Sequence, residues 1–565
     1  MSESDSIPCP NKTKQSRWDR TTTTSEVVAF EATAHRDMSQ RQFAKERGVP
    51  RSTLQHWLSR KATIDADSAV VAFFESPVGL AFLHRLVVAT HLVFTQVGPC
   101  GIRLVCQFLE LSALDRFVAA SYGTQQQISQ KMQAEISTFA AKEQHRMAQG
   151  MSPKKITVCE DETFHPEICL VAIEPVSDFI LAEKYAQHRD AETWNQALKQ
   201  ALEGLPVKII QSTGDEAKGI LAHVRDGLGA HHSPDLFHGQ HELHKATSLP
   251  LQARVSKASQ QVEQAQEQKR RAEQEYQIFL SEPPRRGFPP DFPKRIANAK
   301  QVEAEARQAL EAAQTDREQM RQAIKGIGAD YHPYDLSSAQ PLQAAEVERR
   351  LDARFAQIDQ VAQEANLSEG SLARIEKARR LLKSLVATIA FFHLQVQEWI
   401  SQQALSSEVE WVVLNELIPA LYLERAAKKL PTAEQRAKVE AVYAPILERA
   451  REPGSVLGKF TNEERAQIER VAQQASDLFQ RSSSCVEGRN GQLALRHHSL
   501  HQLTKGKLAA LTVVHNYYLT RSDGTTAAER FFGSKPADLF VWLVDHLEVP
   551  ARPAAKRSKM AQKAA

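Results

Sequence analysis

The sequence predicts a multidomain protein of the α+β or α/β class, with a mixed five-stranded sheet, a large all-helical segment that interrupts it, and helical DNA-binding domains in front. Three observations lead to this prediction. Strand periodicity replaces helical periodicity near residue 154, helical periodicity returns over residues 246–480, and residues 36–62 carry a basic helix-turn-helix pattern. A chain of 565 residues is also longer than one domain, so three or four units are expected.

The first unit that we expect to fold is a helix-turn-helix over residues 36–62. Two apolar sets at helical spacing are separated by Gly48, which supplies the turn, and Pro50 can start the second helix. The outward-facing side chains are the candidate DNA contacts: Arg51, Ser52, Thr53, Gln55, His56, Arg60 and Lys61. An αα-hairpin with a solvated basic face is the alternative. Residues 1–35 are Ser/Thr-rich and polar, which predicts a disordered arm.

Residues 63–150 are predicted to be helical. Their last part has a second helix-turn-helix pattern in which residues 125–131 are exposed, although ordinary helical packing explains it equally well. We therefore predict a second DNA-binding or dimerisation module in this region.

Cysteine usage and apolar runs bear on the location of the protein. The six cysteines show no CxxC spacing and lie mostly inside apolar runs, so we expect reduced, buried thiols and an intracellular protein. The longest apolar stretch, around residues 384–394, is about half as long as a membrane span. The N-terminus also lacks an apolar signal core, so we expect no membrane partner.

Five short β-rich runs occupy residues 151–245, the first part of the predicted sheet unit. Their order is three consecutive strands, a helix, a strand, a helix, and a fifth strand that leads into another helix. The runs cover residues 154–161, 167–175, 179–186, 207–215 and 233–238. Asp161 ends the first run and Asp215 ends the fourth.

Glu487 opens a helix in residues 481–548, which we expect to complete the same unit. Serines in front of it can cap the helix N-terminus. Helical spacing puts Glu487 and Asn490 on one face, and phosphate oxygens would find donors there and nearby: Arg489, Asn490, Arg496 and His497. A capped surface helix with a histidine cluster is the alternative interpretation.

The acids around Asp161 must divide between the two faces of their strand. Residue 161 shares a face with residues 159 and 163, whereas Glu160 and Glu162 point the other way. Carboxylates that converge without a cation would have raised pKa values and would cost stability, so a cation is their natural partner. A polar strand end in solvent is the alternative.

Together these residues resemble the DDE transposases and retroviral-type integrases, which have an RNase H-like core. Asp161 lies at the end of the first strand and Asp215 after the fourth, and the segment VEGRNGQL resembles the family's helix E-x-x-N-x-x-L, with Glu487 as the third acid. The segment DLFH from Asp235 to His238 resembles the C/D-x-x-H signature, a structural motif of hAT-like and Mutator-like transposases.

The resemblance covers residues 154–245 and 482–545 together with the helix-turn-helix. It implies that Asp161, Asp215 and Glu487 form the catalytic triad and bind two Mg²⁺ ions, for which Mn²⁺ can substitute. It further implies a DNA transposase of the insertion-sequence type, which binds the ends of its mobile element. By this resemblance, water would first attack a phosphodiester at the element's end, and the freed 3′-OH would then attack target DNA.

The partners that the resemblance implies are double-stranded DNA, as transposon ends and target, and further copies of the chain in a homodimer or higher oligomer on DNA. Such a protein would be cytoplasmic and nucleoid-associated in a prokaryote. An RNase H-like structure-specific nuclease and a transposase-derived, non-catalytic DNA-binding regulator remain as alternatives.

Residues 246–480 are predicted to be almost wholly helical. Apolar residues spaced by threes and fours over residues 250–324 flank a Pro-rich break and predict an antiparallel coiled-coil hairpin, suited to grasping DNA or a second protomer and equally to a passive spacer. Trp399 and Trp411 are candidates for stacking on an unpaired base, with core packing as the alternative. Residues 549–565 form a basic tail that can add nonspecific DNA affinity.

Overall fold

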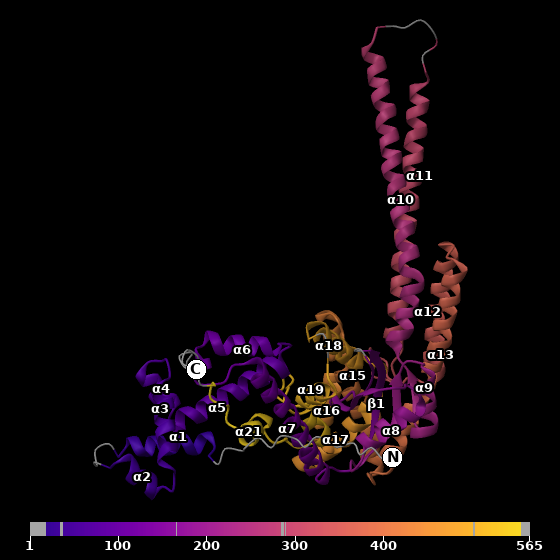
Figure 1. Cartoon of the computed structure of the whole chain (residues 1–565). Helices are drawn as coiled ribbons and strands as arrows, with labels where there is room; N and C mark the ends of the chain where they lie inside the picture. The colour runs from indigo at the N-terminus through magenta and orange to yellow at the C-terminus, as the bar shows by residue number, and fades with distance from the viewer. Residues whose placement is uncertain are drawn as a thin grey trace, which may run out of the picture.

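The computed structural model describes residues 18–33, 38–164, 167–283, 288, 290–500 and 503–554. It is mostly helical and contains one mixed five-stranded sheet, as the predicted α+β class requires. The N-terminal helices gather on one side of the molecule and the sheet lies on the other (Figure 1). Two long helices, α10 (Leu236–Ser281) and α11 (Phe292–Asp330), project together from the body.

Two helices form where the helix-turn-helix is predicted, α2 (Gln40–Glu46) and α3 (Arg51–Ala62). Gly48 lies between them with a φ of +63°, a conformation in which other residues are strained. Pro50 follows in an extended conformation immediately before α3. The turn therefore uses the two residues that the sequence offers for it.

Helix α1 (Arg20–Glu31) stands where a disordered arm over residues 1–35 is predicted, so the prediction is wrong for this segment. Val27 of α1 joins Phe43 and Leu54 in a small core beneath the helix-turn-helix. The sequence does not reveal this helix because threonine side chains make up much of its buried side. The remainder of the predicted arm lies largely outside the described residues.

Residues 63–150 are helical, as predicted. Within the stretch predicted to be exposed, Gln126, Gln127, Gln130 and Lys131 are exposed. Gln125, however, is buried and hydrogen-bonds to His91 and to the Ala119 carbonyl. The expectation of exposure over residues 125–131 is wrong at this position. The elements are α4 (Ser68–Phe74), α5 (Pro77–His91), η2 (Leu92–Val97), α6 (Ile102–Leu111), η3 (Leu114–Arg116) and α7 (Tyr122–Gln149).

One helical stretch among the described residues, Pro77–Val97, is long and apolar enough to cross a membrane. It comprises α5 and η2, and 56% of its most apolar window is buried inside the protein. Core helices of soluble proteins have the same length and composition, and α5 contacts α1, α4 and α21 (Leu539–His546). The burial is thus consistent with a soluble protein.

The sheet has the strand order β3-β2-β1-β4-β5. β1 pairs antiparallel with β2, and β2 with β3, whereas β1 pairs parallel with β4, and β4 with β5. The strands are β1 (Lys154–Phe164), β2 (Ile168–Glu174), β3 (Phe179–Ala186), β4 (Val207–Gly214) and β5 (His231–Pro234). The fifth strand, predicted over residues 233–238, ends earlier because Asp235 caps α10.

Different helices cover the two faces of the sheet. On one face lie α8 (Ala191–Ala201), α9 (Lys218–Ala222) and η4 (His223–Leu228), and Trp194 of α8 shares a core with Val158 of β1. On the other face α18 (Ser484–Leu500) contacts β1 and β2, and its Val486 shares a core with Cys159. Successive residues of β1 thus face different cores, as strand alternation requires.

The hairpin expected over residues 250–324 forms and is longer than expected, because α10 already begins at Leu236. Ion pairs Arg254–Asp316 (2.6 Å) and Lys269–Glu303 (2.9 Å) connect α10 and α11 in antiparallel order. The hairpin therefore grows directly out of the segment that follows β5.

The helices between the hairpin and α18 pack into one large core together with the base of the hairpin. Trp399 is half-buried against this core, in agreement with the core alternative, whereas Trp411 is 58% exposed, so the core alternative is wrong for it. These helices are α12 (Ala344–Glu364), α13 (Glu369–Ser401), α14 (Ser407–Val412), η5 (Val413–Leu417), α15 (Ile418–Lys428), α16 (Ala433–Arg451), η6 (Leu457–Lys459) and α17 (Asn462–Asp477).

After α18 the chain forms α19 (Lys505–Tyr517), α20 (Ala527–Phe532) and α21, and then returns to the N-terminal helices. The Ala551 carbonyl accepts a hydrogen bond from the Ala119 amide, and Arg552 pairs with buried Glu75. The first residues of the predicted basic tail are therefore docked on the protein, while residues 555–565 lie outside the described residues.

Candidate active site

The three acids singled out by the sequence lie on neighbouring elements. Asp161 is on β1, Asp215 directly follows β4, and Glu487 is in the first turn of α18. Glu160 of β1 lies opposite Gly214, the last residue of β4, so Asp215 leaves β4 at the edge where Asp161 continues β1 and pairs with Val171 of β2. Because α18 packs on β1, it delivers the third acid to that edge.

Electrostatic interactions show that the acids are close together. The pKa of Asp161 is raised to about 7, chiefly by burial and also by the negative charges of Glu487 and Asp215. The amide hydrogen bond from Glu162 and the charge of His238 act in the opposite direction. Asp161 is thus within electrostatic reach of Glu487, Asp215 and His238, and we call these four residues the acid cluster.

Two hydrogen bonds fix the carboxylate of Asp161. Its Oδ1 accepts from the Glu162 amide and its Oδ2 from the Asn490 side chain, each at 2.8 Å. Asn490 is buried, with 9% of its surface exposed. Its prediction as a DNA contact is therefore wrong, because its amide is used to orient Asp161.

The Asp235 and His238 pair predicted as a structural motif is present at the start of α10. His238 Nδ1 lies 3.1 Å from Asp235 Oδ2, which also accepts a hydrogen bond from Ser483 Oγ at 2.7 Å. His238 Nε2 lies 4.0 Å from Glu487 Oε1. The hydrogen bond to Asp235 raises the pKa of His238, so a positive charge beside Glu487 is favoured.

The neighbours of Asp161 point to the opposite face, as strand parity predicts. Glu160 is fully buried, accepts from Ser212 Oγ, and lies 3.2 Å from His223 Nε2. Glu162 accepts from Trp194 Nε1 at 3.2 Å. Asp161 is thus the acid of this strand end that faces α18.

Two predicted DNA contacts on α18 are structural instead. Arg489 is buried and pairs with Glu183 at 2.6 Å, and Arg496 donates to the backbone carbonyls of Val97 and Gly98. Both predictions are wrong because the partners come from segments distant in the sequence. His497 is half-buried on the same helix.

The predicted reading face of the helix-turn-helix is largely open to solvent. Arg51, Ser52, Gln55 and His56 are exposed and Thr53 is half-buried. Arg60 instead donates to the Pro553 carbonyl and Lys61 to Glu31 Oε2, so both are engaged within the protein.

Three roles were not predicted from the sequence. Asn490 orients Asp161, Ser483 donates a hydrogen bond to Asp235, and His238 Nε2 lies beside Glu487. The sequence suggests Ser483 only as a helix cap, yet it bonds Asp235 across the chain. Their positions in the sequence could have suggested these roles, because Ser483 precedes Glu487 and Asn490 follows it by about one helical turn each.

The donor set suits a hard divalent cation, because carboxylate oxygens dominate it. Over the described ranges, however, no three His, Cys, Asp or Glu side chains are close enough to form a ready metal cluster. The Glu487 side chain is 41% exposed and can turn toward the strand ends. Asp161, Asp215 and Glu487 are therefore the residues that could hold Mg²⁺ or Mn²⁺ after a side-chain rearrangement.

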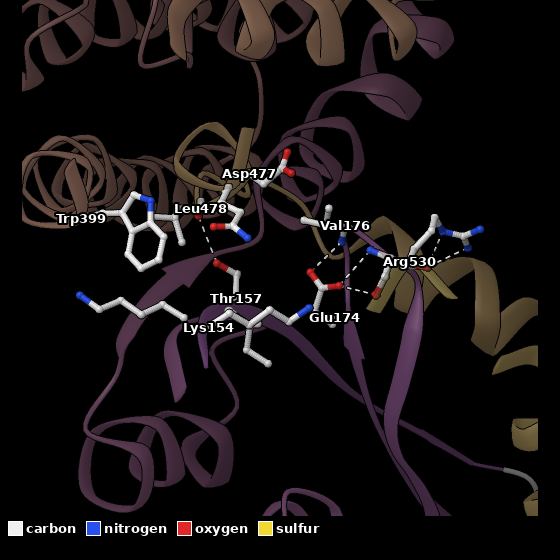
Figure 2. Close-up of a pocket in the computed structure, with 12 residues that line it drawn as sticks. Lys154, Thr157, Glu174, Val176, Trp399, Asp477, Leu478 and Arg530 are labelled. Carbon is white, nitrogen blue, oxygen red and sulfur yellow. Dashed lines mark hydrogen bonds between the residues drawn. The ribbon is translucent and has the colours of Figure 1, made fainter. Parts of the chain in front are cut away.

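A cavity of about 300 Å³ lies elsewhere, beside the start of β1. Lys154 and Asp161 are seven residues apart on one strand, roughly 23 Å. Figure 2 shows Trp399 on one side of this cavity and Glu174 and Arg530 on the other. Glu174 and Arg530 are already bonded to backbone groups of the protein, so the cavity does not belong to the acid cluster.

The model of a protein family of unknown function, DUF6399, matches residues 413–559. This region contains Glu487 and Asn490 and leaves out Asp161 and Asp215. No curated protein matches the chain.

Proposed function

We propose that this chain is a DNA transposase with an RNase H-like core and a DDE triad, which binds the ends of its mobile element and catalyses cleavage and strand transfer. The observation that supports the proposal is that Asp215, which follows β4, and Glu487 of α18 are both within electrostatic reach of Asp161 on β1. Two come from parallel neighbouring strands and the third from a helix far along the chain.

The element order supports the same proposal. Three antiparallel strands are followed by helix, strand, helix and strand, the order that the resemblance implies. The chain then runs through α10 to α17 before α18 packs against β1. A helical segment between the second and third acids accords with hAT-like and Mutator-like transposases.

In this proposal Asp161, Asp215 and Glu487 hold two Mg²⁺ ions, which when bound polarise the phosphodiester and activate the attacking oxygen. Asn490 and the Glu162 amide keep Asp161 oriented toward the site. Ser483 and Asp235 position His238, and its hydrogen bond to Asp235 raises the pKa of this histidine beside Glu487. Asp161 and His238 therefore both have orienting partners.

DNA would be read by α3 and held near the acids by the helical region, with a homodimer or higher oligomer pairing two ends in a prokaryotic nucleoid. The antiparallel hairpin of α10 and α11 is long enough to reach a second protomer. Its first helix, α10, starts beside the acid cluster, because His238 lies in the first turn of α10.

A strand-transfer assay tests the proposal. The full-length chain is incubated with Mg²⁺ and labelled duplexes that carry the element's terminal sequences, together with a plasmid target. We expect labelled ends joined to the plasmid. Cutting without joining would indicate a structure-specific nuclease, and binding without cutting would indicate a non-catalytic regulator.

The reading face of α3 yields a separate prediction. Replacing Arg51 and Gln55 by Ala should weaken binding to the specific end by about 1–3 kcal/mol for each base that is no longer read, because both side chains are exposed and free to reach a DNA groove. Electrophoretic mobility shifts with specific and scrambled duplexes measure the effect. Equal affinity of variant and wild type for the specific end would place sequence recognition outside α3.

A further inference from the structure

A second cavity, of about 190 Å³, lies between α15 and the segment that joins α17 to α18. Three basic side chains line it, together with serines just before and at the start of α18. The lining includes Arg425, Lys429, Arg481, Ser482 and Ser484. Pockets for drug-sized ligands have volumes of roughly 300–1,000 Å³, so this one suits a small anionic group.

Two of the basic side chains are fixed by the protein. Arg425 donates to Asp477 Oδ1 at 3.0 Å and to the carbonyls of Ser476 and Phe479 at 2.9 Å. Arg481 donates to the Gly328 carbonyl at 2.7 Å. The guanidinium groups are therefore held in place, with Asp477 as the carboxylate that faces Arg425.

Lys429 differs from both arginines. Within the described part of the chain its ammonium makes no hydrogen bond and no ion pair with a carboxylate, whereas its neighbour Lys428 pairs with Glu424 at 3.0 Å. Burial, followed by the charges of Arg425 and Arg481, lowers the pKa of Lys429. Its side chain is nevertheless exposed to solvent. Lys429 thus lines the pocket and is also in contact with solvent, as expected at the mouth of a pocket.

The pocket and the acid cluster share one segment of chain. Ser482 and Ser484 line the pocket, and Ser483 between them donates to Asp235 Oδ2. The Ser482 carbonyl also accepts from the Cys159 thiol at 3.7 Å, two residues before Asp161 on β1. A group held in the pocket would therefore lie against the same loop that positions the acids.

We propose that this pocket binds a backbone phosphate of the DNA whose neighbouring phosphodiester lies at the acid cluster. The inference rests on the proposed function, which supplies the DNA. Lys429 provides a charge that makes no ion pair with a carboxylate of the described residues, although the charge of Asp477 is within electrostatic reach of it. Arg425 and Arg481 provide fixed positive charge, and the hydroxyl of Ser484 adds a donor. The phosphate anion supplies the negative charge that this cluster of like charges needs.

The test compares Lys429→Gln with Lys428→Gln in the full chain, using a fluorescent duplex without Mg²⁺ over a range of salt concentrations. Lys428 is the matched control because it adjoins Lys429 but is paired outside the pocket. We expect Lys429→Gln to reduce the salt slope by about one phosphate contact, a loss of roughly five- to tenfold in affinity at 0.1 M salt. Lys428→Gln should leave both unchanged, and Lys429→Arg should restore most of the affinity.

An unchanged slope in Lys429→Gln, or an equal loss in both glutamine variants, would overturn the assignment. Inorganic phosphate is the second probe. If phosphate raises the thermal stability of the wild type but not that of Lys429→Gln, and the substitution does not change DNA binding, the pocket binds free phosphate and not a DNA phosphate. Because DNA binding is measured without catalysis, the two proposals can fail separately. A chain that binds DNA through Lys429 but does not join ends would support this inference and contradict the proposed function. A chain that joins ends while Lys429→Gln leaves the salt slope unchanged would support the proposed function and contradict this inference.

Discussion

Asp161→Asn should abolish metal-dependent cleavage and strand transfer while DNA binding stays close to that of the wild type. The variant keeps the side-chain shape, and its oxygen can still accept from the Glu162 amide, but it loses the charge that holds a cation. Loss of several kcal/mol of transition-state stabilisation corresponds to a rate lower by about 10²-fold or more. Asp215→Asn and Glu487→Gln should give the same result in the same gel assay.

Glu216→Gln is the matched control, because Glu216 follows Asp215 but lies outside the predicted triad. It should retain most of the strand-transfer rate. Full activity in one of the three triad variants would remove that residue from the triad. A loss of strand transfer in Glu216→Gln as large as in Asp215→Asn would show that negative charge near β4 matters more than the exact position of the metal ligand.

The raised pKa of Asp161 leads to a prediction about stability. The pKa of Asp161 is about 7 in the folded protein and near 3.8 as an ordinary aspartate, so the stabilisation present in the protonated state is lost as the pH rises through 7. Without metal at pH 8, Asp161→Asn should therefore be more stable than the wild type, by ~4 kcal/mol as an upper bound at 1.36 kcal/mol per pKa unit.

Urea unfolding at pH 8 and at pH 5 measures this difference, which should shrink at the lower pH. Adding Mg²⁺ at pH 8 should then stabilise the wild type and leave Asp161→Asn almost unchanged, because the cation replaces the missing counter-charge. A wild type that gains nothing from Mg²⁺ at pH 8 would contradict a metal role for this cluster.

Local patterns predicted much of the fold. Gly48 and Pro50 lie in a turn whose backbone conformation suits them. Alternation along β1 correctly predicted that Asp161 and Glu160 point to opposite faces of the sheet. The regular apolar seam predicted the hairpin of α10 and α11. These features depend on neighbours within a few residues, so the sequence contains the information.

The incorrect predictions involve partners far along the chain. Gln125 looks polar and available in the sequence, but His91 on another helix bonds it in the interior. In the sequence Arg496 looks like a phosphate contact, but in the structure it donates hydrogen bonds to the carbonyls of Val97 and Gly98 at the end of η2. Basic and amide side chains suit DNA and buried acceptors equally well, and tertiary packing alone decides between them.

Arg489 gives the largest expected effect on stability. Its guanidinium donates to both carboxylate oxygens of Glu183, at 2.7 and 2.6 Å, with 5% and 0% of the two side chains exposed. Arg489→Ala leaves the Glu183 charge buried with Thr512 as its remaining donor. Breaking a buried pair from one side costs about 3–5 kcal/mol, so the variant should unfold at much lower urea concentration.

The control for Arg489→Ala is Arg270→Ala, whose ion pair with Glu267 is largely exposed on α10 and should contribute little. The double variant Arg489→Met with Glu183→Leu should recover much of the lost stability, because no uncompensated charge then remains between α18 and β3. At a temperature where Arg489→Ala is folded, it should bind DNA as the wild type does. A stable Arg489→Ala protein with weakened DNA binding would instead restore the role that the sequence suggested for this arginine.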